Sequence, residues 1–451
     1  MSYPPSKPPI AFIGLGAMGF AMSTHLVRTG FTVTGYDVYE PTLERWRNAC
    51  AEIPTSSYQA ASSPSEAAKS APITLLMVAT HHHVNSALFD DNGAVHSLPQ
   101  NATVIIAATV PPTHPAEVRQ RLDNDFNRAD VKLIDAPVSG GTARSVNGTL
   151  TIMSSSNDPD NLKDESVHAV LSNLASQGKT LYTIPGSLGS GTSAKALNQV
   201  QCGIHITCTS EMMGLAAVLG LNTRKFFEYL TTPEKENEGW SWMFANRAPR
   251  MLVSDPPMSS ATSIINKDVG IILAEEKRLD VQLPLLDKAS EVLKYAMENG
   301  LASADDSAVV KVYLGLKTPK EELVVQQVRA DKDDKDMFAT LATAHVLVHF
   351  NSSYETVKFA DALDLMGSAQ RDMWFDILAG AAAGSYTFTR VVPVAFADKD
   401  GWQAGFKGYA KENFAGKTDG VRQLVEQARK EGYESKLVEA ALEFVEGMVK
   451  G

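Results

Sequence analysis

The sequence predicts a Rossmann-type α/β domain with a mostly parallel, doubly wound sheet at the N-terminus, followed by one or more all-α domains. Three observations carry this prediction: a glycine-rich turn near residue 14, strand-like runs that alternate with helical or loop segments up to residue 138, and long helical patterns after residue 190. A chain of 451 residues exceeds what one hydrophobic core usually serves, so we expect two or three domains.

The composition limits the class of function. Hydrophobic residues make up 44% of the chain, as in ordinary globular proteins, and the formal net charge of -11 argues against nucleic acid or membrane surfaces as partners, because both attract clustered Lys and Arg. Cys50, Cys202 and Cys208 lack metal-ligand spacing and are interpreted as buried thiols in a reducing compartment. No signal peptide or membrane span is predicted, so we expect a cytoplasmic protein with a small-molecule partner.

The first predicted elements form a nucleotide-binding motif. An apolar run at 10–13 predicts a strand, a glycine turn and a helical pattern up to Thr29 follow, and a β-rich run at 32–36 ends at Asp37. The turn has the sequence GLGAMG, and its residues are the expected cofactor-binding positions Gly14, Leu15, Gly16, Ala17, Met18 and Gly19.

Each part of this motif has a physical role. Gly14 permits a tight turn, Gly16 lets the backbone approach a pyrophosphate, and Gly19 lets the helix lie close to the strand. Asp37 falls where a carboxylate accepts hydrogen bonds from a ribose 2′-hydroxyl and repels a 2′-phosphate, which favours NAD over NADP. The alternative is a glycine turn with a structural role only.

Three further strand-like runs continue the predicted parallel sheet, at 73–80, 102–109 and 131–138. Ligands of such sheets bind beyond the carboxyl ends of the strands, where Thr109 and His81–His83 would fall. Three histidines suggest a metal site, but consecutive residues rarely converge on one ion. We therefore interpret the triplet as a loop beside the cofactor and predict no metal.

Four motifs occur in order along the chain: GLGAMG at 14–19, DAPVSGGTARSVNGTL at 135–150, GSGTSAKALNQ at 189–199 and NKDVG at 266–270. In these motifs the chain resembles the β-hydroxyacid dehydrogenases, the 3-hydroxyisobutyrate dehydrogenase group related to 6-phosphogluconate dehydrogenase. The resemblance extends over about residues 8 to 319. Within it, the motifs SWMFANRAP and DDSAVVKVYLG, which begin at Ser241 and Asp305, look most like the threonate dehydrogenase branch, which oxidises four-carbon sugar acids.

The resemblance makes Lys195 the catalytic general acid/base and Asn198 the residue that holds the substrate hydroxyl or orients the lysine. Alcohol oxidation needs a base near pH 7, and burial beside a positive nicotinamide ring disfavours the ammonium form of a lysine. On a helix that begins near Ser193, the two residues are i, i+3 neighbours. Without the motifs, Lys195 would be interpreted as a surface lysine. Gln199 departs from the family, in which a second asparagine is common.

The resemblance also implies binding roles. Ser139, Gly140 and Gly141 would bind the substrate carboxylate, and Thr109 and Lys267 would contact the cofactor. A serine hydroxyl with exposed backbone N–H groups suits this task, because such groups bind a carboxylate without adding a competing base. The alternatives are a plain loop for the Ser-Gly-Gly sequence, and a solvated surface pair for the lysine and the aspartate that follows it.

The last third of the chain repeats the helical region. An offset of 144 aligns 205–221 with 349–365, and 276–293 matches 428–445. The same offset places Ala339 opposite Lys195 and Ala342 opposite Asn198, so the second copy lacks the predicted catalytic residues. The alternative is an unrelated helical appendage. The predicted organisation is a lead-in at 1–9, an NAD-binding domain at 10–186, a helical catalytic domain at 187–319, a charged linker or helix at 320–337, and a degenerate helical repeat at 338–451.

These predictions combine into NAD-dependent oxidation of a small hydroxy acid, with a four-carbon sugar acid such as threonate favoured. Alternatives within this chemistry are 3-hydroxyisobutyrate oxidation and tartronate semialdehyde reduction. An alternative of another class is a non-catalytic NAD-binding protein for sensing or assembly, against which Lys195 counts. We expect a monomer with an internal pseudo-dimer, or a homodimer.

Overall fold

The computed structural model describes residues 7–54, 56–253, 256, 258–316 and 335–450. The described chain forms two compact units, each considered by itself below: Met1–Ala196 with Ser368–Ile377, and Leu197–Gly367 with Leu378–Gly451. Most of the predicted lead-in and of the predicted charged linker lies outside the described residues. No helix in the described part of the chain is long and apolar enough to span a membrane.

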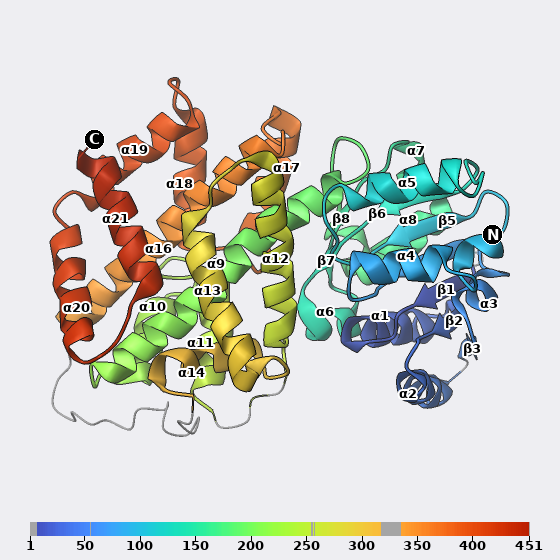
Figure 1. Ribbon diagram of the computed structural model, residues 1–451, viewed down its shortest axis with the longest axis horizontal. Coiled ribbons are helices and arrows are strands. Elements are labelled where there is room, and N and C mark those ends of the chain that lie inside the picture. Colours follow the sequence, from blue (N-terminus) through green and yellow to red (C-terminus); the bar gives the residue numbers. More distant parts are fainter. Residues whose placement is uncertain (1–6, 55, 254–255, 257, 317–334, 451) are drawn as a thin grey trace. The chain divides into compact units, whose positions relative to one another are not determined.

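A six-stranded parallel sheet forms the centre of the first unit, which confirms the predicted fold class (Figure 1). The strand order is β3-β2-β1-β4-β5-β6, and every neighbouring pair is parallel. The order reverses between β1 and β4, which is where ligands of such sheets bind. The strands are β1 (Ile10–Ile13), β2 (Thr32–Tyr36), β3 (Ser57–Ala60), β4 (Ile73–Leu76), β5 (Thr103–Ile106) and β6 (Lys132–Asp135).

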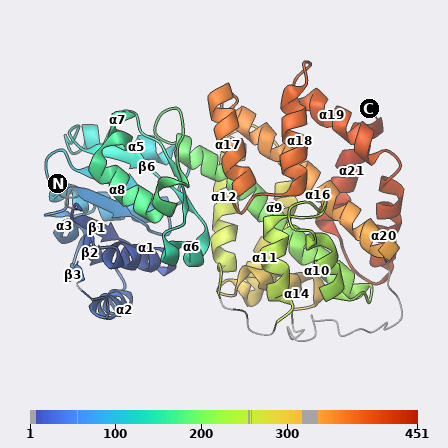
Figure 2. The same cartoon turned by 180° about the vertical axis from the view of Figure 1, so that it is seen from behind.

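Helices cover both faces of this sheet, because its central strands are apolar on both sides. One face packs against α1 (Ala17–Arg28), α2 (Glu40–Ala51) and α8 (Glu165–Leu174). The other packs against α3 (Pro64–Ala68), α4 (His81–Phe89) and α5 (His114–Asn124). Figure 2 shows the same unit from behind.

A second, three-stranded sheet follows, which the sequence did not predict. The run 131–138 was predicted as one strand, but the structure ends β6 at Asp135 and starts β7 in another sheet. Pro137 lies between the two strands and cannot donate a ladder hydrogen bond, which suits the break. The new elements are β7 (Val138–Ser139), α6 (Gly141–Asn147), β8 (Thr151–Ser154), α7 (Asp160–Lys163) and β9 (Leu181–Thr183).

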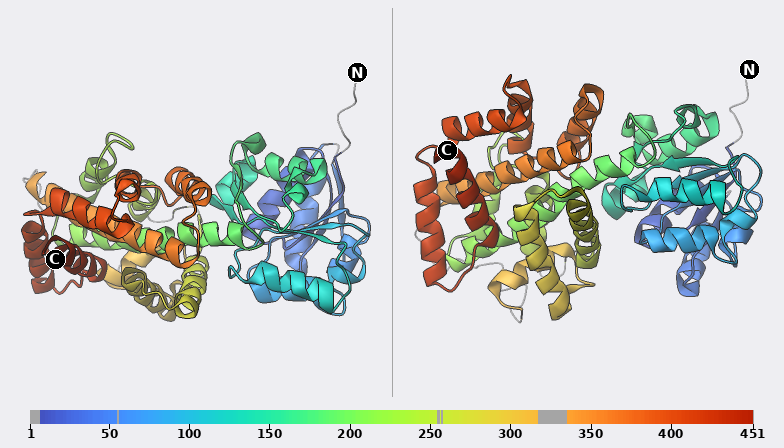
Figure 3. Two further views of the ribbon diagram at one scale, coloured as in Figure 1. Left: turned by 90° about the horizontal axis from the view of Figure 1, so that it is seen from above. Right: turned by 45° about the horizontal axis from the view of Figure 1, so that its top comes forward.

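The rest of the chain is helical. We call residues 190–314 the first helical segment, which contains α9 (Ser190–Val218), α10 (Thr223–Thr231), α11 (Trp242–Met251), α12 (Thr262–Leu279), α13 (Pro284–Ala296) and α14 (Val310–Leu314). We call residues 335–450 the second helical segment, which contains α16 (Lys335–Ala362), α17 (Ser368–Gly380), α18 (Tyr386–Ala397), α19 (Trp402–Phe414), α20 (Thr418–Lys430) and α21 (Lys436–Lys450). Figure 3 shows the long helices α9 and α16.

Equivalent positions of the two segments contact each other reciprocally. Trp242 N donates to Gly384 O at 2.8 Å, and Tyr386 N donates to Trp240 O at 2.9 Å. Each donor and each acceptor has its counterpart 144 residues away, so exchanging the segments reproduces the contact. This is the pattern of an isologous two-fold interface, here within one chain.

Two buried glutamates, one in each helical segment, make a second set of reciprocal contacts. Glu211 in α9 accepts hydrogen bonds from the backbone N–H groups of Leu437 and Val438, at the start of α21. Glu355 in α16 accepts hydrogen bonds from those of Leu285 and Leu286, at the start of α13. Each carboxyl group therefore satisfies the otherwise unpaired N-terminus of a helix in the opposite segment.

Candidate active site

The glycine turn after β1 has the conformation that its predicted roles require. Gly14 has a φ of 93°, and a Cβ atom there would lie 2.5 Å from Met77 O. A Cβ atom at Gly19 would lie 1.9 Å from Gly14 O, so only glycine allows α1 to approach the turn this closely. By contrast, a Cβ atom at Gly16 would meet no atom of the described residues within 4 Å, which leaves space beside the backbone.

The N-terminus of α1 opens at this turn. Gly16 is its N-cap, Ala17 and Met18 form its first turn, and no side chain among the described residues caps it. Uncapped N–H groups and the helix dipole favour an anion such as a pyrophosphate.

Asp37 follows the end of β2, at the wall of a cavity of 880 Å³ that Gly14 and Gly16 also line. Its carboxylate accepts hydrogen bonds from Leu15 N at 2.7 Å and from Tyr39 N at 2.9 Å. These two bonds fix the carboxylate beside the glycine turn. A group placed in this way suits recognition of a ribose that is bound in the cavity.

The three consecutive histidines begin α4, so the predicted loop is wrong. Thr80 is the N-cap of this helix and accepts a hydrogen bond from His83 N at 3.3 Å. Burial, with the charges of His81 and His82, lowers the pKa of His114 to about 4. Among the described residues, none of the three histidines belongs to a group with metal-ligand geometry.

The Ser-Gly-Gly sequence joins β7 to α6. Ser139 is buried at the end of β7, opposite Thr151 of β8. Gly140 and Gly141 both have positive φ, 137° and 65°, and a Cβ atom at Gly140 would lie 2.5 Å from the Arg144 side chain. Consecutive residues in such conformations can turn their N–H groups toward one anion.

A buried carboxylate anchors the start of α9 to the first unit. Asp135 accepts hydrogen bonds from Thr192 N at 2.8 Å, from Thr192 Oγ1 at 2.5 Å and from Ser155 Oγ at 3.1 Å. The Ser155 hydroxyl in turn accepts from Gly191 N at 3.0 Å. Burial raises the pKa of Asp135 to about 6, although these hydrogen bonds act in the opposite direction. The network begins α9 at Ser190, three residues before the predicted start.

Lys195 and Asn198 lie on consecutive turns of α9, with 5% and 1% of their surfaces exposed. The first belongs to the first compact unit and the second to the other, since the division falls after Ala196. Asn198 Nδ2 donates to Gln199 Oε1 at 2.8 Å, whereas Asn198 Oδ1 is buried and has no hydrogen-bond partner among the described residues. This oxygen is therefore available to accept a hydrogen bond from a bound group.

A series of polar side-chain contacts leads from Asn198 to α12. Gln199 Nε2 donates to the Asp268 carboxylate, and the Lys267 ammonium lies 2.9 Å from the same carboxylate. Asp268 is buried, so this pair is not the solvated surface pair considered from the sequence. Thr109 is half-buried three residues after the end of β5. Contacts of Thr109 and Lys267 with a cofactor stay predictions.

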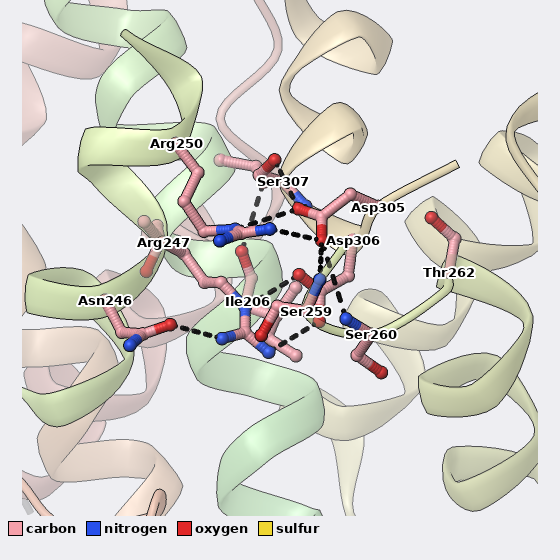
Figure 4. Close-up of polar contacts among 12 residues, drawn as sticks. Ile206, Asn246, Arg247, Arg250, Ser259, Ser260, Thr262, Asp305, Asp306 and Ser307 are labelled. Carbon is pink, nitrogen blue, oxygen red and sulfur yellow. Dashed lines mark hydrogen bonds and ion pairs between the residues drawn. The ribbon is translucent and has the colours of Figure 1, made fainter. Parts of the chain in front are cut away.

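The two motifs resembling the threonate dehydrogenase branch meet in a pair of ion pairs (Figure 4). Arg247 of α11 donates to Asp306 at 2.7 and 2.9 Å, and both side chains are buried. Arg250 donates to Asp305, which also accepts from Ser259 N at 2.7 Å. Burial opposes ionisation of Asp305, but the hydrogen bonds from Arg250 and from neighbouring serines lower its pKa. The network holds the chain just before α12, the helix that carries Lys267.

Comparison with known proteins places these features in a family. Residues 9–184 match the family model described as the NAD binding domain of 6-phosphogluconate dehydrogenase, and residues 189–313 match that described as NAD-binding of NADP-dependent 3-hydroxyisobutyrate dehydrogenase. The L-threonate dehydrogenase of Cupriavidus necator is 33% identical over 310 residues, which are 69% of this chain and 97% of that protein. The chain belongs to the 3-hydroxyisobutyrate dehydrogenase-like family of β-hydroxyacid dehydrogenases. It is an NAD(P)-dependent oxidoreductase that acts on a small hydroxy acid.

Other members and structures agree with this assignment. The human mitochondrial 3-hydroxyisobutyrate dehydrogenase is 27% identical, over 67% of this chain and 86% of that protein. A crystal structure of 3-hydroxyisobutyrate dehydrogenase from Salmonella typhimurium has a TM-score of 0.58 and 27% identity, and covers 68% of this chain and 99% of that one.

The 6-phosphogluconate dehydrogenase of Plasmodium falciparum covers 98% of this chain and 93% of its own, with a TM-score of 0.64 and 13% identity. At this identity the likeness concerns the fold alone, but it extends over both helical segments.

Sequence reasoning missed three groups in this β-hydroxyacid dehydrogenase: the Asp135 anchor, the link from Gln199 to Asp268, and the pair of Arg247 with Asp306. The anchor lies inside the motif DAPVSGG, but nothing local indicates that its partner is 57 residues away. The other two groups join residues 69 and 59 positions apart. The available signal for Asp135 was a charged residue at the end of an apolar strand.

Proposed function

We propose that this β-hydroxyacid dehydrogenase oxidises a four-carbon sugar acid such as threonate and uses NAD as its cofactor. The observation that carries the proposal is the placement of Lys195 and Asn198 on consecutive turns of α9. The lysine is buried, and the amide oxygen of Asn198, one turn later, has no hydrogen-bond partner among the described residues. The choice of threonate rests on the similarity to the L-threonate dehydrogenase of Cupriavidus necator.

In the proposed mechanism Lys195 is the general base. When bound, NAD supplies the hydride acceptor for the carbon that carries the hydroxyl group. Lys195 Nζ takes the hydroxyl proton as the hydride leaves, and returns it when the reaction runs as a reduction. Asn198 Oδ1 accepts a hydrogen bond from the hydroxyl or from the lysine, which positions the two for proton transfer. Asp135 holds the start of α9 and so acts as a positioning residue.

Binding of the carboxylate is assigned to the turn before α6. The Ser139 hydroxyl and the N–H groups of Gly140 and Gly141 are neutral donors, and they bind an anion without competing with Lys195 for the proton. The preference for NAD rests on Asp37, whose carboxylate would repel the 2′-phosphate of NADP.

The second helical segment is part of the same proposal as a degenerate copy of the first. Ala339 and Ala342 stand 144 residues after Lys195 and Asn198, so the copy has no acid/base group of its own. Its reciprocal contacts with the first segment support an internal pseudo-dimer, in which a single chain provides both sides of a helical interface.

The test compares the wild-type protein with Lys195→Ala and Lys411→Ala. Lys411 lies 144 residues after Lys267 and is exposed in α19, so its removal controls for the loss of a lysine. Initial rates of nicotinamide reduction are measured with NAD and NADP against threonate and erythronate stereoisomers, 3-hydroxyisobutyrate and glycerate, and of oxidation with tartronate semialdehyde. We expect turnover of a four-carbon acid with NAD, and a fall in kcat/KM of about 10³-fold or more in Lys195→Ala only.

NAD binding by calorimetry should be unchanged in both variants. Turnover of another acid instead would replace the substrate but keep the role of the lysine. No turnover in either direction, with NAD still bound, would contradict the proposal and favour a sensing or assembly protein.

A further inference from the structure

Three side chains that the proposed mechanism does not use converge inside the helical unit. Cys208 comes from α9, and His345 and His349 come from α16. All three are buried, and their ligand atoms lie within 4.8 Å of one another. Cys208 Sγ and His345 Nδ1 are 3.6 Å apart.

The hydrogen bonding of this cluster is incomplete. Neither ring nitrogen of His349 has a hydrogen-bond partner among the described residues, although the side chain is 1% exposed. The two rings of His345 and His349 have centroids 4.2 Å apart, so they present polar atoms to the same small space. Burial of an imidazole without any partner is costly, and buried polar groups in native proteins usually have a partner in the protein, an ordered water or an ion.

The geometry fits a transition-metal ion. A tetrahedral zinc ion with bonds of roughly 2.0–2.3 Å holds neighbouring ligand atoms roughly 3.3–3.7 Å apart. The separation of Cys208 Sγ and His345 Nδ1 already lies in this range. His345 and His349 are i, i+4 neighbours, so they lie on one face of α16, and α9 supplies the thiol from the opposite side.

The symmetry-related position gives an internal reference. The residues 144 positions from Cys208, His345 and His349 are Ser352, Gln201 and His205. There the Ser352 hydroxyl donates to Gln201 Oε1 at 3.5 Å and lies 3.1 Å from His205 Nε2. The hydroxyl of this reference cluster has hydrogen-bond partners, although Gln201 Nε2 and His205 Nδ1 have none among the described residues, and the cluster offers no thiolate.

The contrast between the two clusters is chemical. Equivalent places on the same two helices hold Ser, Gln and His in one case, and Cys, His and His in the other. The set of Cys208, His345 and His349 has the ligands that zinc prefers, which are thiolate sulfur and neutral imidazole nitrogen. A further imidazole, that of His205, has its ring centroid 3.8 Å from that of His349.

We propose that Cys208, His345 and His349 bind one divalent transition-metal ion of the zinc class, which links α9 to α16. Binding replaces the thiol proton with the metal and releases that proton to solvent. Cys208 is more than three helical turns further along α9 than Lys195, so the proposed ion is structural and the dehydrogenase chemistry does not depend on it directly.

The first experiment uses the complete protein without a histidine tag, produced in zinc-supplemented medium. Zinc is measured by mass spectrometry after gel filtration, and the protein is then treated with a chelator and titrated with Co²⁺. We expect about one zinc per chain, and a thiolate-to-cobalt charge-transfer band that reaches its maximum at about one equivalent. Zinc below about a tenth of an equivalent, together with no charge-transfer band, would overturn the proposal.

Variants locate the site. Cys208→Ser and His349→Gln should lose the band and most of the zinc. Cys50→Ser, which removes a buried thiol from the first unit, and Ser352→Ala, which changes the reference cluster, should keep both. Far-ultraviolet circular dichroism checks that each variant is folded. Retention of the band by folded Cys208→Ser would exclude this site, and the wild-type cobalt spectrum decides the question even where a variant does not fold.

Discussion

The first helical segment carries Lys195 and Asn198 at the start of α9, whereas the equivalent positions near the start of α16 hold Ala339 and Ala342. The difference extends further along the chain. Arg247, which pairs with Asp306 in the first segment, is matched by Val391, a core residue of α18. At these three positions, polar or charged side chains of the segment to which the chemistry is assigned are replaced by apolar ones in the other.

Some of the residues by which the segments contact each other are the same in both segments. Glu211 and Glu355 each bind the start of a helix in the opposite segment, and the rings of His205 and His349 have centroids 3.8 Å apart. On the proposed function, the role of the second segment is to provide an interface surface. It completes a two-fold interface and leaves the chemistry to the first segment.

A change at Asn198 gives the largest expected effect that distinguishes the two segments. We expect Asn198→Ala to lower kcat/KM for the hydroxy acid by about 10²-fold, because the substrate hydroxyl or the lysine loses an acceptor that acts in a buried site. Ala342→Asn, which places the same amide in the second segment, should leave the steady-state kinetics unchanged. Equal losses in both variants would contradict the assignment of chemistry to the first segment alone.

The retained interface gives the next largest effect. Glu355→Ala leaves two buried N–H groups of α13 without an acceptor, and Glu211→Ala does the same at α21. We expect each change to lower the free energy of unfolding by about 2–4 kcal/mol, measured by urea denaturation. A loss in one variant and none in the other would show that the interface is not reciprocal.

The pH dependence of the free energy of unfolding is a second test of these two glutamates. Burial raises the pKa of Glu211 to about 7 and that of Glu355 to about 8, although the backbone hydrogen bonds act in the opposite direction. The folded state then keeps protons that the unfolded state has lost above its ordinary carboxyl pKa. Stability should fall as the pH rises from 5 to 8, by at most about 1.4 kcal/mol per pH unit for each group. Glu355→Gln, which cannot ionise, should flatten this slope.

The sequence predicted the parts of the site that depend on local conformation. Gly14 has the positive φ that the motif requires, and Gly19 allows the close approach of α1 to the turn. Asp37 follows the end of β2 and accepts a hydrogen bond from Leu15 N. These features follow from a short stretch of chain, in which a strand, a turn and a helix fix one another. Five strands of the parallel sheet were predicted for the same reason, since each has its own apolar or β-rich run. The edge strand β3, with the sequence SYQA, has no such run and was not predicted.

What could not be predicted depends on residues far apart in the chain. The start of α9 is set by Asp135, so a pattern that begins with small residues placed it three positions too late. The histidines after β4 were assigned to a loop, although Thr80 before them is a typical N-cap that predicts a helix. Cysteine spacing and the consecutive histidines predicted no metal, and that prediction is not tested. Spacing along the chain cannot show that Cys208 lies 3.6 Å from His345, 137 residues later, where a metal site is proposed.

The smallest expected effect concerns the two serines that form a β-bridge between the segments. Ser241 caps α11 and accepts from Phe244 N at 3.2 Å, and Ser385 caps α18 and accepts from Phe388 N at 3.1 Å. We expect Ser241→Ala and Ser385→Ala each to cost about 1 kcal/mol of unfolding free energy. Because the two serines form a β-bridge with each other, the cost of the double variant should differ from the sum of the single costs, and the difference measures their coupling.

Chemical denaturation, monitored by a signal from the helical unit, tests whether both serine variants lower the stability of the same unfolding transition. A reciprocal interface couples α11 and α18, so both serines should shift the same cooperative unfolding step by similar amounts. If Ser385→Ala shifted a separate transition that left the first segment folded, the second segment would be an independent domain. The retained contacts would then not explain why it has persisted after losing its lysine.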